Sequence, residues 1–373
     1  MHIVFAGGGT AGHINPALSV ANYLKRVDPD CRISFVGTAR GMESRLVPLA
    51  GYDFYTIDVR GFQRRLTVKN ICRNITAAYK AVTASSSSKK LLKKLQPDVV
   101  VGTGGYVCGP LLRKAAKMGI KTAVHEANAY PGMTIKMLAP LVDCVMIAME
   151  DAVKNVNPKN PAVITGNPIR QSLTEITKQK ARQKLGISET EKVVLSFGGS
   201  LGAKAINNAM LDVIKWNLEN KKFMHFHATG KAAYHGFLEN ANGIGYKENN
   251  GSVKIIEYID NMDVMLAAAD IVISRAGAMS VNEFQVCGKP SILIPSPFVA
   301  ENHQFHNAMS LKRIDAAELI EEKDLSGESL LNMVNEMLAD EQRLENMSKA
   351  AKASAIVDAD RKIAEIIINL AKK

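Results

Sequence analysis

The N-terminal segment combines three spaced glycines with a histidine, a pattern that suits phosphate chemistry. The apolar run Ile3–Ala6 is followed by Gly7, Gly9 and Gly12, and then by an apolar periodic segment that predicts a helix. Glycines let the backbone turn tightly and approach a ligand, while free N–H groups at a helix start attract anions. His13 lies within the same turn. The segment therefore predicts a phosphate or diphosphate site with a titratable side chain beside it.

The same glycine spacing matches the fingerprint of dinucleotide-binding enzymes. That fingerprint also needs an acidic residue about twenty positions later, which holds the ribose. The predicted second strand, Arg32–Val36, instead runs into Gly37 and Arg40 with no acid between them. An arginine there could serve NADP, so an NADP-dependent dehydrogenase remains a weaker alternative.

A second glycine turn recurs about 190 residues further along the chain. The predicted strand Val193–Phe197 leads into the turn at 198–202 and then into a predicted helix at 205–214. Two phosphate-type turns in two sheets indicate two facing domains. Because ligands of open α/β sheets bind at the carboxyl ends of the strands, we expect a shared site in the cleft between the domains.

Polar side chains follow other predicted strands of the first half. The strand Val99–Val101 ends in a third glycine cluster at 102–106, which alone is an ordinary strand-to-helix turn. A further strand ends in His125 and Glu126, for which a buried structural pair and a catalytic pair are equal alternatives. Asn128 is better suited to hydrogen bonding with a sugar or a base.

The region from 270 to 304 is dense in polar signals. A helix predicted to start at Ser280 carries Glu283 one turn in, where the carboxylate could accept hydrogen bonds from a ribose diol. The alternative is that Glu283 only complements the helix dipole, as any acid in a first turn does. The loop after the next strand holds a polar cluster at 301–304, and loops in that position commonly carry function.

The predicted elements alternate between strands and helices, which indicates an α/β fold with two doubly wound parallel sheets. We place a domain linker near 165–168, followed by a charged helix at 171–185, and predict domains 1–165 and 166–349. A long C-terminal helix at 350–370 begins a closing segment, 350–373. Strands are expected at 3–6, 32–36, 99–101, 122–125, 144–148, 193–197, 223–228, 253–257, 271–274 and 291–295.

Charge is unevenly distributed along the 373 residues. Residues 1–165 hold 22 Lys and Arg against 10 Asp and Glu, a net charge of +12, whereas residues 166–373 hold 25 against 26, a net charge of −1. The first half therefore suits an anionic partner, either a membrane surface or a nucleic acid. Nucleic acid is disfavoured because no recognised motif is present and aromatic residues make up only 6% of the chain.

Ten of the basic residues lie between Arg60 and Lys94, around an apolar helical face, and Ser85–Ser88 is predicted to form a flexible break. This combination favours an anionic membrane surface, although such a face also packs on a sheet in ordinary α/β folds. No run reaches eighteen apolar residues and no signal-peptide pattern begins the chain, so we expect no export. Five widely spaced cysteines indicate reduced thiols rather than disulfides or a zinc site.

Taken in order, these motifs resemble the MurG family of bacterial glycosyltransferases. The resemblance rests on residues 7–13, 102–106, 125–128, 166–170, 198–202, 275–278 and 302–304. It implies a GT-B fold, in which two Rossmann-like domains face each other and a C-terminal helix crosses back to the first. It also implies inverting transfer of N-acetylglucosamine from UDP-GlcNAc to the 4-hydroxyl of lipid I, giving lipid II for the bacterial cell wall.

The resemblance implies a set of site residues and partners. The first domain would take the acceptor and the second the donor, with Thr10, Ala11 and Gly12 forming a loop over the reaction centre. No metal or cofactor is expected, since the diphosphate can be stabilised by the 198–202 helix start and Arg170. The implied donor contacts are Asn128, Arg170, Ser200, Ile259, Ala278, Met279, Ser280, Val281, Asn282, Glu283 and Gln304.

Inversion needs a base, and His13 is the candidate because a neutral imidazole can accept a proton near pH 7. A histidine that only orients the acceptor is the alternative. By resemblance the protein lies peripherally on the cytoplasmic face of the membrane, touching anionic phospholipid and possible partners among cell-wall synthesis proteins. Ala11 and Ala127 depart from a common glycine and glutamine of the family, and another GT-B enzyme acting on a glycolipid is the main rival.

Overall fold

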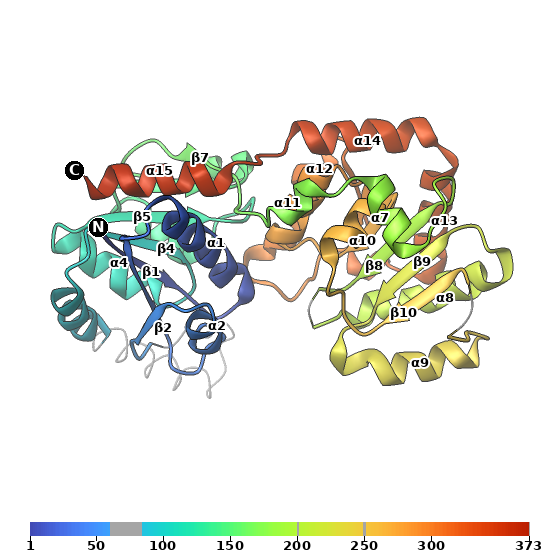
Figure 1. The fold of residues 1–373 in the computed structure, drawn as a ribbon, viewed down its shortest axis with the longest axis horizontal. Helices are drawn as coiled ribbons and strands as arrows, with labels where there is room; N and C mark the ends of the chain where they lie inside the picture. Colours follow the sequence, from blue (N-terminus) through green and yellow to red (C-terminus); the bar gives the residue numbers. More distant parts are fainter. Residues whose placement is uncertain (60–83, 200, 249–250, 373) are drawn as a thin grey trace. The chain divides into compact units, whose positions relative to one another are not determined.

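The computed structural model describes residues 1–59, 84–199, 201–248 and 251–372 (Figure 1). The chain divides into two compact units. The first unit contains Met1–Ile169 together with Ile356–Lys373, and the second contains Arg170–Ala355. The end of the chain therefore belongs with its beginning.

The first unit is built on a seven-stranded parallel sheet with the order β3-β2-β1-β4-β5-β6-β7. The short strands β3 and β7 were not predicted. The strands are β1 (His2–Gly7), β2 (Arg32–Gly37), β3 (Asp53–Thr56), β4 (Val99–Gly104), β5 (Lys121–Glu126), β6 (Cys144–Ile147) and β7 (Val163–Ile164).

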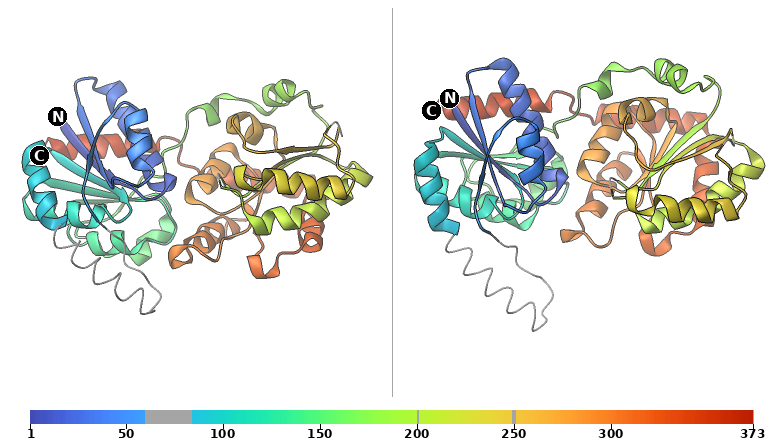
Figure 2. Two further views of the ribbon diagram at one scale, coloured as in Figure 1. Left: turned by 90° about the horizontal axis from the view of Figure 1, so that it is seen from below. Right: turned by 60° about the horizontal axis from the view of Figure 1, so that its bottom comes forward.

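Helices cover both faces of this sheet, because its central strands are apolar on both sides. Ile3 and Phe5 of β1 pack in one core with α1 and α15, whereas Val4 packs on the opposite face with α4 and α5. Figures 1 and 2 show α15 alongside α1. The helices include α1 (Ala11–Val27), α2 (Glu43–Leu49), α4 (Cys108–Lys117), α5 (Met133–Leu138), the 3-10 helix η1 (Glu150–Asn155) and α15 (Ala359–Ala371).

The second unit repeats the plan with a six-stranded parallel sheet of order β10-β9-β8-β11-β12-β13. Its strands are β8 (Val193–Phe197), β9 (Met224–Ala228), β10 (Val253–Ile256), β11 (Ile271–Ser274), β12 (Ser291–Leu293) and the unpredicted β13 (Ala317–Leu319). Its helices include α6 (Ser172–Glu175), α7 (Lys178–Leu185), α8 (Lys204–Asn220), α9 (Tyr234–Gly243), α10 (Met262–Ala268), α11 (Ala278–Cys287), α12 (His303–Lys312), α13 (Gly327–Ala339) and α14 (Glu341–Ala353).

Two helix predictions and one predicted break were wrong in detail. The predicted helix at 350–370 is two helices, α14 and α15, which are separated where Ile356 packs against Gly166. The predicted helix at 171–185 is also divided, because Thr177 adopts an extended conformation and caps α7 by accepting from the N–H of Lys180. Ser85–Ser88 is helical rather than a break, and the remaining residues of the basic segment at 60–83 lie outside the described part.

Candidate active site

The glycine turn after β1 leads directly into α1. Thr10 has an extended backbone and makes no side-chain cap bond, so the first N–H groups of α1 are left without that partner. The helix begins at Ala11, which places Gly12 and His13 in its first turn. The prediction that Thr10, Ala11 and Gly12 form a loop was therefore wrong for Ala11 and Gly12, because the helix starts earlier than the apolar pattern indicates.

His13 is held in one orientation by backbone groups. Its Nδ1 atom lies 3.0 Å from the carbonyl oxygen of Gly8 and 3.3 Å from Thr10 Oγ1. A carbonyl only accepts, so Nδ1 carries the proton and Nε2 presents a lone pair. The Thr103 hydroxyl donates to the His13 carbonyl at 2.7 Å, and a Cβ at Gly104 would lie 2.6 Å from the imidazole ring. The contacts therefore hold the imidazole at the start of α1 with Nδ1 as a donor, which leaves Nε2 as the ring atom that can accept a proton.

Glu43 supports the glycine turn and was missed by the sequence analysis. Its buried carboxylate accepts hydrogen bonds from the N–H of Gly9 at 3.0 Å and from the N–H of Thr38 at 2.9 Å. A Cβ at Gly8 or Gly41 would lie less than 2.5 Å from this carboxylate. Burial opposes ionisation, but these hydrogen bonds hold the pKa of Glu43 below its usual range. No local signal could reveal this role, because the glycine turn at Gly9 lies 34 positions before Glu43 in the chain.

His125 and Glu126 form separate structural contacts rather than a pair. His125 is buried and its Nε2 lies 3.0 Å from the carbonyl oxygen of Gly166, while burial lowers its pKa to about 4. Glu126 accepts from Gly132 and from both the N–H and the side-chain amide of Asn128. Burial raises the pKa of Glu126, and these donors oppose the rise. The structural alternative fits this geometry, and Asn128 is held at the end of β5.

The second glycine turn lies at the carboxyl end of β8. Gly199 and Gly202 have φ values of 89° and 74°, a region that favours glycine, and a Cβ at Gly202 would lie 2.1 Å from the carbonyl oxygen of Thr229. Ala203 precedes α8 without a side-chain cap, so the first N–H groups of α8 lack that partner. This arrangement suits an anion. Ser200 itself lies outside the described residues.

The start of α11 lies at the carboxyl end of β11. Ala278, Met279 and Ser280 are partly exposed in its first turn, whereas the side chains of Val281 and Asn282 are buried. Any ligand contact at 281 and 282 would therefore come from the backbone.

Glu283 lies in the second turn of α11, and the first turn carries no acid, so the helix-dipole alternative loses its basis. Burial raises the pKa of the Glu283 carboxyl, and the Arg170 guanidinium opposes that rise. The structure therefore brings Arg170 and Glu283 into electrostatic range of each other.

Two more predicted residues follow neighbouring strands. Ile259 comes after β10 and is 6% exposed, next to the more exposed Tyr258. Gln304, in α12, uses its Oε1 atom to accept from the N–H of Ser296 at 2.8 Å and so orders the loop after β12. The strands are parallel, so the described residues 198, 199, 201, 202, 259, 278–283 and 304 all belong to the carboxyl edge of one sheet.

Comparison with models of known protein families identifies the family of this chain. The model of the glycosyltransferase family 28 N-terminal domain matches residues 3–147, and that of the family's C-terminal domain matches residues 193–363. The chain belongs to glycosyltransferase family 28. The dehydrogenase and nucleic-acid alternatives are therefore abandoned, and the predicted enzyme class is confirmed.

Individual relatives of this glycosyltransferase cover its whole length. A protein of Acetivibrio thermocellus named UDP-N-acetylglucosamine--N-acetylmuramyl-(pentapeptide) pyrophosphoryl-undecaprenol N-acetylglucosamine transferase is 42% identical over 100% of this chain and 99% of its own. A Bacillus cereus protein with the same name, numbered 1, is 41% identical over 100% of both chains. The predicted resemblance is thus confirmed.

Solved structures agree on the fold. The crystal structure of Acinetobacter baumannii MurG is 28% identical, covers 99% of both chains and has a TM-score of 0.80. The calicheamicin glycosyltransferase CalG4, at 14% identity and a TM-score of 0.70, shares the fold alone. The predicted α/β GT-B fold class is confirmed.

Two further observations concern the described residues only. No group of three or more His, Cys, Asp or Glu side chains among them could hold a metal ion. Every helix in the described part of the chain is too short or too polar to span a bilayer.

Proposed function

We propose that this glycosyltransferase moves N-acetylglucosamine from UDP-GlcNAc to the 4-hydroxyl of lipid I, undecaprenyl-diphospho-MurNAc-pentapeptide, with inversion, and so forms lipid II for peptidoglycan. Support comes from full-length relatives named for this transfer. The observation in the structure that carries the proposal is the alignment of the described donor residues 259, 278–283 and 304 along one sheet edge.

The donor diphosphate would lie at the start of α8. The uncapped N–H groups there and the glycine turn offer donors without a side chain in the way. Arg170 would add a positive charge as the diphosphate leaves. Glu283 would accept hydrogen bonds from the ribose hydroxyls, which would offset the cost of its burial.

The acceptor hydroxyl would be activated by His13. In this step the 4-oxygen forms a bond to C1 of the sugar, the bond from C1 to the diphosphate oxygen breaks, and UDP leaves. The hydroxyl proton moves to Nε2 of His13, whose Nδ1–H remains bonded to Gly8. The charged imidazolium would be favoured by the carboxylate of Glu126, with which it interacts electrostatically.

We also propose that the first unit docks peripherally on an anionic membrane at the cytoplasmic face, where a lipid-linked acceptor would lie. The positive charge of residues 1–165 supports this. Met133 and Met137 of α5 are 52% and 59% exposed on either side of Lys136, which places apolar and basic side chains together. Association with cell-wall synthesis proteins stays a prediction.

The membrane proposal predicts salt-sensitive binding to vesicles that contain phosphatidylglycerol or cardiolipin. Changing Arg64, Arg65, Lys69 and Arg73 together to glutamate should abolish co-sedimentation while donor binding survives. Equal binding to neutral and anionic vesicles would contradict docking by charge.

The proposed reaction is tested by measuring UDP release with a lipid I analogue and a panel of nucleotide sugars. UDP-GlcNAc should be the preferred donor, and release should require the acceptor and continue in EDTA. Comparable rates with a different glycolipid would support the rival GT-B enzyme, and loss of activity in EDTA would contradict metal independence.

A further inference from the structure

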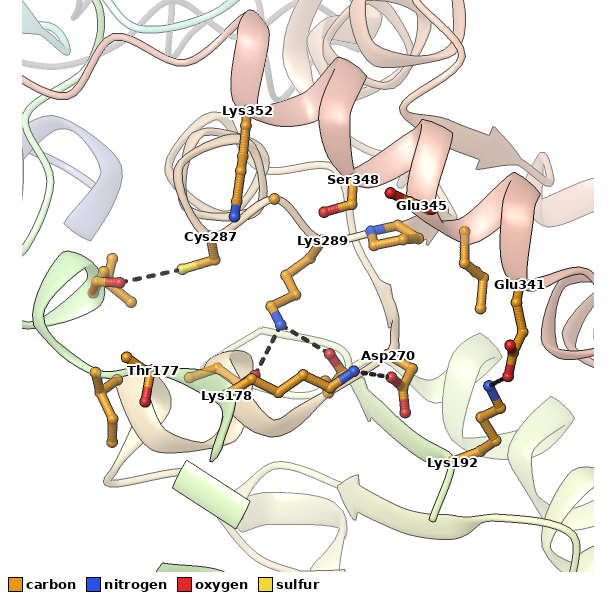
Figure 3. Close-up of a pocket in the computed structure, with 17 residues that line it drawn as sticks. Thr177, Lys178, Lys192, Asp270, Cys287, Lys289, Glu341, Glu345, Ser348 and Lys352 are labelled. Atoms are coloured by element: carbon orange, nitrogen blue, oxygen red, sulfur yellow. Dashed lines mark hydrogen bonds and ion pairs between the residues drawn. The ribbon is translucent and has the colours of Figure 1, made fainter. Parts of the chain in front are cut away.

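The second unit contains a pocket of about 610 Å³ that belongs to none of the loops described above (Figure 3). Its lining includes Lys192, Asp270 and Pro290, which immediately precede β8, β11 and β12. The pocket therefore lies at the amino edge of the sheet. The proposed donor residues lie at the carboxyl edge, so the two sites are distinct.

The carboxylates of this pocket are already paired. Asp270 binds Lys178 at 2.5 Å and the buried Arg182 at 2.7 Å. Glu341 is paired with Lys192, and Glu345 binds Lys349 at 2.7 Å. These pairs leave no carboxylate for the remaining lysines of the pocket.

Two of those lysines point into the pocket from neighbouring elements (Figure 3). Lys289 is 7% exposed, and its ammonium group donates to the carbonyl oxygens of Ala267 at 2.9 Å and Ala269 at 2.8 Å. Both acceptors are neutral, and among the described residues no carboxylate lies within 4 Å of this ammonium group; Asp270, which is held by Lys178 and Arg182, acts on it only from a longer range. An ammonium group has three donors, and these bonds use two of them.

Lys352 reaches the same end of the pocket from α14. Its aliphatic chain packs over Gly288, where a Cβ would lie 2.5 Å from its Cε atom. Among the described residues no carboxylate lies within 4 Å of its ammonium group. Burial lowers the pKa of Lys289 to about 8; repulsion from Lys178 and Lys352 adds to this shift, while Cys287 and Asp270 oppose it. The positive charges are thus crowded at one end of the pocket.

The rest of the lining is partly apolar, with Leu173, Ile176 and Leu344 among its side chains. A volume of this size is within the range of small-molecule sites, and a few polar anchors in an apolar wall are typical of them. We propose that this pocket binds a small amphipathic anion, with its carboxylate or phosphate head on Lys352 and Lys289 and its apolar body against these three side chains.

The positions of the residues that line the pocket suggest that a bound anion affects the rate of sugar transfer. This step rests on the proposed function. The chain enters this unit at Arg170 and leaves it at Ala355, and the pocket is lined by Leu173 near the entry and by Lys352 near the exit. Cys287 lines it too, from the same helix as Glu283, and its thiol donates to the carbonyl of Leu173 at 3.7 Å. Occupancy should therefore alter the rate of transfer.

Binding is tested by calorimetric titration of the full chain, without substrates, using octanoate, octyl phosphate and uncharged octanol. At least one anion should bind saturably with a Kd of about 1 mM or lower, while octanol should bind at least about 10-fold more weakly. The two anions distinguish a carboxylate head from a phosphate head. Lys352→Met should weaken binding about 10-fold or more, whereas Lys352→Arg should retain it.

Lys215→Met is the control, since Lys215 is exposed on α8 and does not line the pocket. It should leave affinity within about 2-fold of the unaltered chain. Absence of saturable binding by both anions, equal binding of octanol, or full affinity in Lys352→Met would each overturn the site.

The effect on transfer is measured separately, as kcat with the anion that binds. A change in kcat that disappears in Lys352→Met is expected. Binding without any change in kcat would overturn the regulatory step and leave the site standing. If the chain proved to transfer a different sugar, the titration without substrates would still decide whether the pocket binds anions.

Discussion

The Nδ1 atom of His13 lies 3.0 Å from the carbonyl oxygen of Gly8, and this contact fixes which ring nitrogen can act as a base. Because Nδ1 must donate to the carbonyl, the lone pair is on Nε2. The imidazole is therefore prepared for proton transfer before any substrate arrives.

His13→Ala should lower kcat by about 100-fold or more while the affinity for UDP-GlcNAc changes little, because the base acts on the acceptor. Steady-state kinetics and calorimetric donor titration give the two quantities. The exposed His235→Ala is the control and should behave as the unaltered enzyme. A His13 variant that keeps most of its kcat would reduce His13 to orienting the acceptor.

Glu283→Ala should weaken UDP-GlcNAc binding by about 1–3 kcal/mol, the scale of a charge-assisted hydrogen bond lost from a site. The fold should survive, since Glu283 is only partly buried. Calorimetry measures the affinity, with Glu336→Ala on an exposed face of α13 as the matched control. Unchanged affinity in the folded variant would remove Glu283 from the donor site.

Glu43→Ala should destabilise the first unit by about 1–3 kcal/mol, because it removes the buried carboxylate that accepts from the N–H groups of Gly9 and Thr38. The loss should appear in urea denaturation, and kcat should fall as the glycine turn loosens. Glu150→Ala, at an exposed position of the same unit, should have no comparable effect. Unaltered stability and kcat in Glu43→Ala would show that the glycine turn keeps its conformation without the Glu43 carboxylate.

Two buried histidines should make the second unit sensitive to acid. Ser196 Oγ lies 2.8 Å from both His225 Nε2 and His227 Nδ1, and the other nitrogen of each ring has no hydrogen-bond partner among the described residues. Burial lowers the pKa of both His225 and His227 to about 3. The folded unit therefore holds both rings neutral.

The sign of the pH effect follows from that shift. The pKa of each histidine is about 6.5 in the unfolded chain and lower in the folded unit, so below pH 6.5 the unfolded chain binds protons that the folded unit does not. The folded unit is therefore most stable above pH 6.5, and it loses stability as pH falls from 6.5 toward 3. The free energy of unfolding should drop by about 1.4 kcal/mol per pH unit for each histidine in that window. Urea denaturation at pH 7 and pH 5 should show it. His227→Leu should reduce the slope and His235→Leu should not; equal slopes in all three proteins would contradict the account.

The sequence predicted the central strands well because their signal is local. Val99–Val101 and Ile271–Ser274 are short apolar runs next to glycine or polar turns, and both form buried strands. The strands β3 and β7 were missed since they are short and partly exposed, so they carry little apolar pattern. The break between α14 and α15 was missed because alanine and isoleucine continue on both sides of it.

Site residues could be predicted from the sequence where they belong to the motifs that follow the strands. His13 was found from its position beside the glycines, but its fixed tautomer depends on Gly8, and only the folded turn shows that. Glu43 was invisible because its partner Gly9 lies 34 positions away in the chain. The buried charge of Lys289 could not be foreseen for the same reason, since its acceptors come from the end of α10.

The most direct test of the central claim is the structure of the product made from UDP-GlcNAc and a lipid I analogue. The proposed reaction should add one N-acetylglucosamine through the 4-hydroxyl in the β configuration, as determined by mass spectrometry and NMR. A product with the α configuration, a sugar on another hydroxyl, or release of UDP without any glycosylated lipid would contradict it.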